Sequence, residues 1–202
     1  MTRVRVRDYA NAMNEPARID LAEAREIVPS TKARFTTAEF LRMSESGAFD
    51  DMKIELVGGE LERMPPSGLT HADRQVRIIL LLGAILPARC LVGEVGLDLG
   101  DDTLLGCDLA ALYAPLEGNR MALPSEVALV VEIAETTASR DRGMKRLAYA
   151  RAAIPTYWVV DGKRELTHVY SEPRDGDYAQ VDTVRFGQPL AVPGTDATIT
   201  ID

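Results

Sequence analysis

The chain has 202 residues, of which 31 are acidic and 23 are Lys or Arg, so its formal net charge is −8. This length favours one domain with a short appendage, and no apolar run approaches the roughly 20 residues that span a bilayer. The N-terminus lacks the apolar core of a secretory signal, and Cys90 and Cys107 are too few for a disulfide scaffold or a four-cysteine zinc site. We therefore expect a cytoplasmic protein with no membrane partner. The acidic balance also argues against non-specific coating of nucleic acid.

Residues 1–34 alternate charges with few large apolar residues, and we interpret them as a loosely attached N-terminal extension with a short helix near 20–28. The single folded domain is expected over 35–202. Its N-cap residues and helical apolar spacing predict helices over about 36–43, 70–86 and 140–151. Apolar runs bounded by turns predict strands at 54–61 (two, joined by a Gly58-Gly59 turn), 90–99, 105–113, 127–134, 156–161, 165–170 and 177–182. This pattern predicts a mixed α/β fold around one sheet.

The helix predicted at 70–86 is amphipathic. Its apolar residues recur at helical spacing, and we expect the core-facing side to carry Val76, Ile79, Leu80 and Gly83. The helix should end near Pro87, since proline cannot continue it.

Two carboxylates lie where buried strands are expected. Glu132 falls inside the apolar run 127–134, and Asp108 falls at the start of the run 107–113. An ionised carboxylate buried alone costs several kcal/mol, so each needs a cation or strong donors. On neighbouring strands the two can share a divalent cation such as Mg²⁺ or Mn²⁺, which prefers oxygen ligands. The alternative is that each accepts an Arg side chain or a backbone donor at a strand end.

The residues that follow Glu132 are strongly basic. The segment 136–151 carries five basic side chains against the single Asp141, a local charge of +4. A basic helix beside an acidic metal site suits a phosphodiester that is attacked by metal-activated water. A solvated basic face in which Asp141 pairs with Lys145 also explains the charge run, but it does not explain a buried Glu132.

Glu55 and His71 are further candidates. Glu55 alternates with apolar residues along its strand and should point away from them, so an exposed strand glutamate is the preferred interpretation. His71, at the start of a predicted helix, can contact phosphate or carry a proton near neutral pH. Helix-end capping or solvent exposure is the competing interpretation. His168 has no charged neighbours in the sequence, and we assign it no role.

Four segments follow one another in a recognisable order: IELVGGEL, PPSGLTHA, CDLAAL and LVVEIAETTASRDRGMKRLAYARAAIPTYWVVD. This succession resembles the Uma-two family of restriction-endonuclease-like proteins, which belongs to the PD-(D/E)XK nuclease superfamily. The resemblance covers about 35–178, and its most specific piece is 141–161. It implies a restriction-endonuclease-like core, in which a central mixed sheet is flanked by helices and the metal site lies on adjacent strands.

The resemblance implies a metal site by position. Asp108 corresponds to the aspartate of the superfamily's PD motif and Glu132 to its second acidic residue. These two side chains, with the backbone carbonyl near Ile133, are expected to bind Mg²⁺ or Mn²⁺. Lys145, on the following helix, is expected to orient or activate the attacking water and to steady the charge on phosphorus.

The resemblance also implies supporting roles. Glu55 matches a family glutamate and is expected to assist at the metal. His71 matches a family histidine that follows the Pro-rich loop. Arg142 or Arg146 is expected to hold the substrate phosphate.

The chain departs from the family and superfamily patterns at several positions, among them Ile54 in place of the tyrosine before Glu55, which is a modest change. Cys107 replaces the proline before Asp108, which is tolerable because proline supplies no ligand. Ala134 stands where the superfamily lysine usually lies, so Lys145 must reach in from the helix. Glu135 replaces a serine, and this extra carboxylate either turns inward, where it adds to or spoils the metal site, or lies on the opposite face.

These expectations describe a Mg²⁺-dependent endonuclease that hydrolyses phosphodiester bonds of nucleic acid, DNA rather than RNA. The alternative is a nuclease-fold binding or assembly module with little or no catalysis, which the net charge of −8 favours. A homodimer would place two basic helices side by side, and this would offset the effect of the acidic net charge on binding nucleic acid. A glycoside hydrolase that uses Glu55 and Glu132 leaves the basic helix without a role. Basic side chains around the Asp108–Glu132 cleft would favour catalysis, whereas ion pairs elsewhere would favour the module.

Overall fold

The computed structural model describes residues 32–135 and 138–202 of the chain. The N-terminal extension, with the helix expected near 20–28, lies outside the described residues apart from its last few positions. The elements below all belong to one compact unit, residues 34–202. None of the described helices is long and apolar enough to cross a membrane.

Helices and strands follow one another in the predicted order. The helices are α1 (Thr37–Glu45), α2 (Leu69–Gly83), the 3-10 helix η2 (Pro124–Glu126), α3 (Ala138–Arg140), the π-helical η3 (Asp141–Lys145) and α4 (Arg146–Arg151). The strands are β1 (Lys53–Val57), β2 (Glu60–Met64), β3 (Leu91–Asp98), β4 (Leu104–Leu112), β5 (Val127–Ala134), β6 (Thr156–Asp161), β7 (Leu166–Arg174), β8 (Asp177–Arg185), β9 (Pro189–Ala191) and β10 (Thr198–Thr200). The prediction missed β9 and β10, and it ended β7 and β8 too early.

Local sequence explains the first elements. Thr36 caps α1 through a capping box, because its side chain accepts from the Glu39 amide while the Glu39 carboxylate accepts from the Thr36 amide. The β1–β2 hairpin turns at Gly58 and Gly59, which have φ values of 53° and 84°. Positive φ at both central residues is what a type I′ hairpin turn requires, and glycine adopts it without steric cost.

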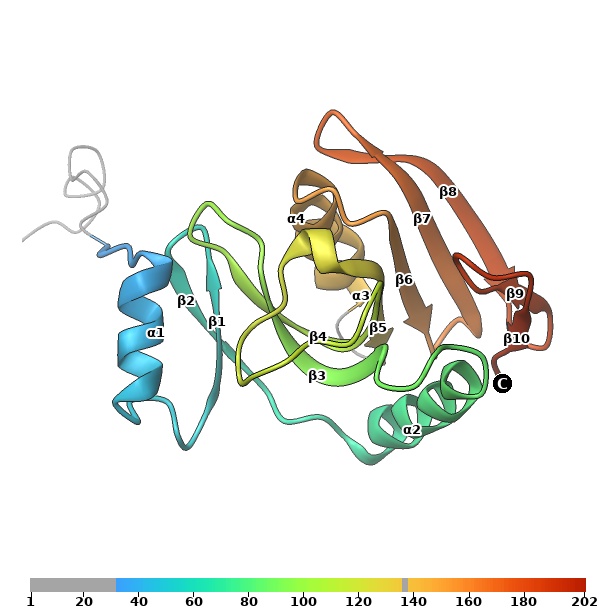
Figure 1. The fold of residues 1–202 in the computed structure, drawn as a ribbon, viewed down its shortest axis with the longest axis horizontal. Coiled ribbons are helices and arrows are strands. Elements are labelled where there is room, and N and C mark those ends of the chain that lie inside the picture. Colours follow the sequence, from blue (N-terminus) through green and yellow to red (C-terminus); the bar gives the residue numbers. More distant parts are fainter. Residues whose placement is uncertain (1–31, 136–137) are drawn as a thin grey trace, which may run out of the picture. The chain divides into compact units, whose positions relative to one another are not determined.

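Eight strands form one sheet in the order β2-β1-β4-β5-β6-β7-β8, with β3 also paired to β4 (Figure 1). Among the described strands, β5 and β6 are the one parallel pair of this sheet, and the other neighbours are antiparallel. A parallel pair needs a crossover connection, and here the helical segment that includes α3, η3 and α4 supplies it. The sheet is therefore mixed, as predicted.

Helices cover the two faces of the sheet (Figure 1). On one face α4 contributes Tyr149 and Ala150 to an apolar core. On the other face α2 contributes Ile78 and Leu82 to a second core, which the residues of β9 and β10 complete. The prediction of a mixed sheet flanked by helices is confirmed.

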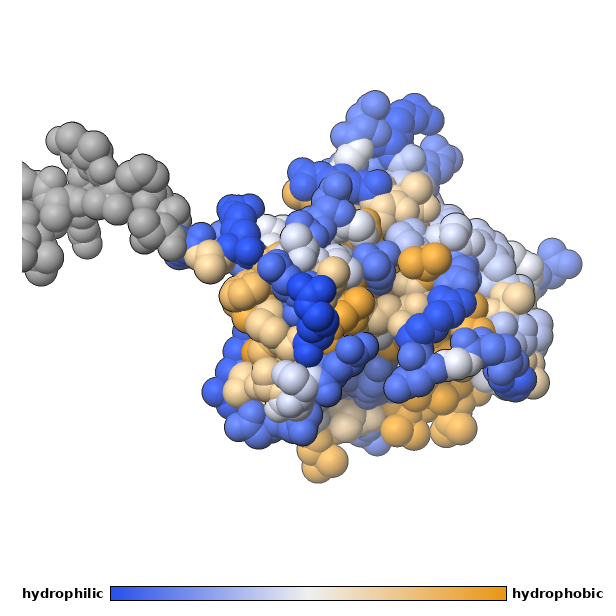
Figure 2. Space-filling view, turned by 60° about the vertical axis from the view of Figure 1, so that its left-hand side comes forward, coloured by the Kyte–Doolittle hydropathy of each residue, from blue (hydrophilic) through white to orange (hydrophobic). Residues whose placement is uncertain are grey.

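The predicted apolar face of α2 is only partly the buried one, since Ile79 packs against the second core. Ile78 and Leu82 are fully buried, whereas Val76 and Leu80 are 55% and 68% exposed. Apolar residues surround much of this helix, so their spacing alone does not select one face. Figure 2 shows hydrophobic side chains gathered at the lower edge of the molecule, at the height that α2 has in Figure 1.

One edge of β4 is open over part of its length, and this opening positions the site. β3 pairs with one edge of β4 from end to end, so β1 and β5 must share the other edge. β1 contacts that edge at Leu104, and β5 pairs with it only from Leu109 onward. Residues 105–108 consequently have no strand partner on that edge within the described sheet. Their exposed backbone groups need other hydrogen-bond partners.

Candidate active site

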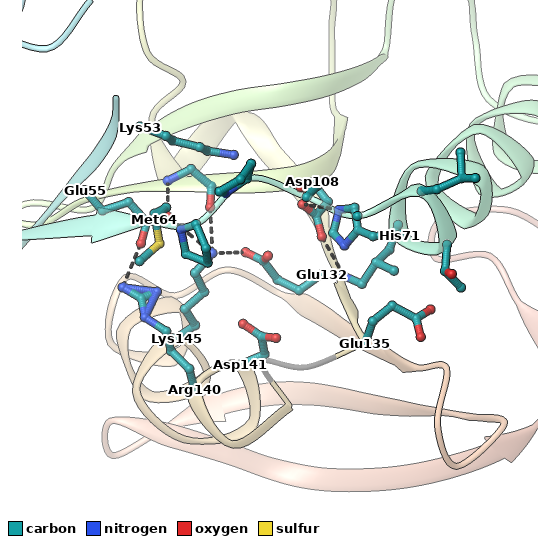
Figure 3. Close-up of a pocket in the computed structure, with 18 of the residues that line it drawn as sticks. Lys53, Glu55, Met64, His71, Asp108, Glu132, Glu135, Arg140, Asp141 and Lys145 are labelled. Carbon is teal, nitrogen blue, oxygen red and sulfur yellow. Dashed lines mark hydrogen bonds and ion pairs between the residues drawn. The ribbon is translucent and has the colours of Figure 1, made fainter. Parts of the chain in front are cut away.

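The open edge of β4 faces a cavity of about 470 Å³. Its titratable lining residues come from β1, α2, β4, β5, the helical crossover and the loop after β6: Lys53, Glu55, His71, Asp108, Glu132, Glu135, Arg140, Asp141, Lys145 and Lys163. Figure 3 shows Glu55, Arg140 and Lys145 on one side of the pocket, His71 and Asp108 on the other, and Glu132 between them. The five residues expected to be catalytic are thus gathered in one cavity.

Asp108 and Glu132 lie beside each other on adjacent strands. The β4–β5 ladder ends at the pair Leu109 and Val131, and the next position along would pair Asp108 with Glu132. There the Asp108 Oδ2 atom accepts a 2.6 Å hydrogen bond from the Ile133 amide. The N–H and C=O groups of one strand residue point to the same side, so the Ile133 carbonyl also faces β4. Its role as a metal ligand stays a prediction.

Glu132 is buried with two donors on one oxygen. Its Oε1 atom accepts from Lys145 Nζ at 2.7 Å and from the Tyr149 hydroxyl at 2.8 Å. Burial raises the pKa of Glu132 to about 8, although Lys145 opposes that shift. Burial alone would lower the pKa of Lys145, but the carboxylates of Glu132 and Glu55 outweigh it and raise that pKa. Lys145 therefore stays charged at neutral pH, and Glu132 accommodates further positive charge.

Glu55 is not exposed, contrary to the preferred interpretation of its strand pattern. Its residue is 2% exposed, because β1 lies beside the open edge of β4. Glu55 Oε1 accepts from the Gly106 amide at 3.0 Å, and Lys145 Nζ donates to the Gly106 carbonyl at 2.8 Å. Two side chains thus replace the missing strand partner. Lys145 Nζ also lies 3.4 Å from Glu55 Oε1.

A π-helical turn interrupts the predicted helix at 140–151. The i→i+5 bonding of η3 brings residues five apart toward one side of the helix, which an α-helix would separate. Arg140 and Lys145 are five apart, and both contact Glu55: Arg140 Nη2 lies 2.8 Å from Glu55 Oε2. The irregular turn therefore directs two cations into the same cavity.

His71, Asp108 and Glu94 form a second cluster. His71 Nε2 lies 3.3 Å from Asp108 Oδ1, and the Asp108 carboxylate raises the pKa of His71. Glu94 contacts Lys53 Nζ at 2.7 Å and Gln75 Nε2 at 2.9 Å. One ligand atom from each of the three cluster residues lies within 4.8 Å of the others. This cluster can hold a metal ion.

Glu94 has a strained backbone. It lies within β3 with φ at 51°, a left-handed conformation that costs a non-glycine residue roughly 1–2 kcal/mol. The β3–β4 pairs on either side of it place Glu94 opposite Asp108. The strained residue is therefore the one whose carboxylate belongs to the cluster with Asp108 and His71.

Glu135 turns inward because β5 ends at Ala134. It lines the cavity, but its Oε1 atom is held by Arg74 Nε at 2.8 Å. The Arg74 guanidinium also lies over the Phe186 ring, 5.0 Å from its centroid. The extra carboxylate therefore has a fixed cation of its own.

The structure does not place Arg142 or Arg146 in the cavity lining. Arg146 Nη2 pairs with Asp177 Oδ2 at 3.0 Å, and its guanidinium lies over the ring of Tyr170. The physical reason is the π turn, which directs Arg140 and Lys145 to the cavity and leaves Arg146 facing β7 and β8. The expected phosphate contact of these two arginines has no support in their location.

Two acidic side chains and a lysine thus lie together at an open strand edge of a mixed sheet. The chain belongs to the Uma2 family, described as "Putative restriction endonuclease", whose model matches residues 37–202. The resemblance seen in the sequence is thereby confirmed. Family and fold together support a nuclease-like function.

A crystal structure from Anabaena variabilis, described as a "putative nuclease belonging to DUF820", is similar to this chain. The two share 17% sequence identity with a TM-score of 0.62, over 83% of this chain and 95% of that one. At this identity the likeness shows the fold. A search among curated proteins found no match.

The sequence analysis assigned no role to Glu94, Arg74 or Tyr149. A signal for Glu94 was present, because a hairpin that turns at 99–103 places it opposite Asp108. Tyr149 lies one helical turn after Lys145, within the family signature, which was a second usable signal. Nothing in the local pattern around Arg74 indicates that it would meet Glu135.

Proposed function

We propose that the protein is a Mg²⁺-dependent endonuclease, with Mn²⁺ as an alternative ion, that hydrolyses phosphodiester bonds of nucleic acid. One observation carries the proposal: Asp108 and Glu132 lie side by side at an open strand edge, with Lys145 Nζ 2.7 Å from Glu132. The resemblance to PD-(D/E)XK nucleases implies this combination of two carboxylates and one cation. The family and the fold support the same class of reaction.

The residues present fit a hard divalent cation. Asp108, Glu132 and Glu94 offer carboxylate oxygens, which Mg²⁺ and Mn²⁺ prefer. Among the described residues, Glu132 Oε2 accepts no hydrogen bond, and burial raises the pKa of this side chain to about 8. A nearby cation would therefore favour its ionised form. When bound, the ion would lower the pKa of a water molecule and polarise a phosphoryl oxygen.

The chain's own residues would position and stabilise the reacting phosphate. Lys145 stays protonated, so it acts as a cation near the developing charge and not as a base. Of its three contacts, that with Glu55 at 3.4 Å is the longest and the easiest to exchange for a phosphate oxygen. His71 lies in the first turn of α2, at a helix N-terminus that lines the cavity and favours anions.

The substrate and setting are part of the proposal. The description of the family as restriction endonucleases favours DNA over RNA. We also propose residues 35–202 as the nuclease domain, a cytoplasmic location and a homodimer, which would bring a second basic helix to the substrate. Sedimentation analysis of the full chain, alone and with a duplex, tests the homodimer directly.

The test is cleavage of a supercoiled plasmid and of a structured RNA in Mg²⁺, Mn²⁺ and EDTA. We expect metal-dependent cleavage, stronger on DNA, and a loss of at least about 100-fold for Lys145→Gln. Arg146→Gln removes a cation from the same helix but outside the cavity, so it should retain activity. Absence of cleavage by the folded wild type with metal bound contradicts the proposal.

A second candidate function is a nucleic-acid binding module without catalysis. Two observations favour it: the basic side chain of Arg146 forms an ion pair with Asp177 outside the cavity, and the chain carries net charge −8. The same assay separates the two functions. Binding of the plasmid without any nicking in either metal identifies a module.

A further inference from the structure

Arg140 is fixed in the cavity by only part of its guanidinium. Its Nη2 atom contacts Glu55 Oε2 at 2.8 Å and Glu62 Oε2 at 2.6 Å. Its Nη1 atom is buried and has no hydrogen-bond partner among the residues that the structure describes. Buried donors in native proteins are nearly always paired, so an unpaired one calls for an explanation. Arg140 also lines the cavity that holds Asp108 and Glu132.

The position of Arg140 depends on the same irregular turn that positions Lys145. Residues five apart share one side of η3, and Glu55 lies between the two cations, 2.8 Å from Arg140 Nη2 and 3.4 Å from Lys145 Nζ. Lys145 is committed to Glu132, and Lys53 is committed to Glu94 at 2.7 Å. Of these three cations, Arg140 is the one with a buried donor that has no acceptor in the described part of the chain.

We propose that Arg140 Nη1 binds a non-bridging phosphate oxygen of the nucleic-acid strand in the cavity. This inference rests on the proposed function for the identity of the ligand. Arg140 takes the place of Arg142 and Arg146 as the phosphate contact. A guanidinium suits this role because its planar fork holds carboxylates on one arm and a phosphate on the other.

The test measures binding of a fluorescein-labelled DNA duplex of 20 base pairs to the full chain by anisotropy, across a series of salt concentrations. Ca²⁺ replaces Mg²⁺, since it shares the preference for oxygen ligands. Arg140→Gln should weaken binding roughly tenfold. It should also reduce the slope of log K against log salt by about 0.9, the value for one phosphate contact. Arg140→Lys keeps the charge and should restore the slope.

Matched variants separate phosphate binding from a structural role. Arg146→Gln should leave the slope unchanged if its ion pair with Asp177 keeps it away from the substrate. Glu62→Gln removes one carboxylate from Arg140 but leaves its Nη1 atom, so binding should become tighter or stay equal. A merely structural Arg140 would make Glu62→Gln and Arg140→Gln behave alike. Thermal unfolding of each variant identifies loss of folding.

The outcomes of this inference and of the proposed function are distinct. Equal affinity and equal slope for wild type and Arg140→Gln overturn the inference, even if the wild type cleaves DNA. Reduced slope in Arg140→Gln without any cleavage by the wild type supports the inference and contradicts the endonuclease. A wild type that binds no duplex at any salt concentration overturns both.

Discussion

The carboxylates in the two halves of the cavity have different hydrogen-bond and ion-pair partners. Beside the helical crossover, Glu132 has Lys145 at 2.7 Å, and Glu55 has Arg140 at 2.8 Å. Beside α2, Asp108 has the Ile133 amide and a histidine, and its backbone carbonyl accepts from a neutral glutamine. Glu132 and Glu55 thus contact permanent cations, whereas the described contacts of Asp108 are with neutral donors and a histidine.

This difference separates two functions of buried acidic groups. A carboxylate with a fixed cation belongs to a network whose disruption leaves a buried charge uncompensated. A carboxylate with mainly neutral donors keeps its negative charge available to a ligand. The half beside the crossover should therefore matter most for folding, and the half beside α2 for binding a metal.

The largest expected effect is on folding, from Lys145→Met. This change leaves Glu132 and Glu55 buried without their shared cation, so we expect a loss of about 3–5 kcal/mol in the free energy of unfolding. Urea denaturation of the full chain measures it. Lys53→Met is the control, because its pair with Glu94 is about half exposed on both sides and should cost less than about 1 kcal/mol. Equal losses for the two variants would erase the distinction between the halves.

Asp108→Asn should instead act on metal binding. Asparagine keeps an acceptor for the Ile133 amide, so the free energy of unfolding should fall by no more than about 1 kcal/mol. Loss of a charged ligand should weaken Mn²⁺ binding at least about tenfold. Calorimetric titration of Mn²⁺, without and with a short duplex, measures the affinity. Unchanged Mn²⁺ affinity would remove Asp108 from the metal site.

The sequence predicted the sheet well because its information is local there. Each central strand is an apolar run bounded by turn residues, and the glycine pair between β1 and β2 selects a hairpin. The sequence did not predict β9 and β10, because a three-residue strand in a tail rich in Pro, Gly and Thr shows no usable alternation of apolar and polar residues. The sequence also did not predict which face of α2 is buried, because apolar residues surround the helix.

The candidate site was predictable where a residue conflicts with its surroundings. Glu132 and Asp108 are carboxylates in apolar runs, and this conflict alone indicated a site. Glu55 was assigned to solvent because alternation assumes a strand with one wet face, and the open edge of β4 removes that assumption. The role of Arg140 depends on the π turn, which local propensity does not predict.

Glu94→Gly should raise the free energy of unfolding and weaken metal binding in the half of the cavity beside α2. Glycine adopts φ near 51° without the cost of roughly 1 kcal/mol or more that Glu94 bears. The half-exposed contact with Lys53 that is lost contributes little. We expect a net gain of about 0.5 kcal/mol in urea denaturation and weaker Mn²⁺ binding. A loss of stability would show that the contacts of Glu94 outweigh its strain.

The smallest effect concerns an ion pair outside the cavity, between Glu126 and Arg120. The Arg120 guanidinium, with the Leu123 amide, lowers the pKa of Glu126 to about 2 from 4.5. A carboxylate with a lowered pKa contributes stability above its unfolded pKa, and this contribution disappears as the pH falls from 4.5 toward 2. The stability difference between wild type and Glu126→Gln should therefore be present at pH 6 and shrink by pH 3.

Urea denaturation at several pH values measures the contribution of Glu126. Both partners are partly exposed, so solvent screens the pair and the difference should be far smaller than that for Lys145→Met. The two ion pairs then differ mainly in burial. A Glu126 effect as large as the Lys145 effect would show that burial is not what makes the crossover half of the cavity important for folding.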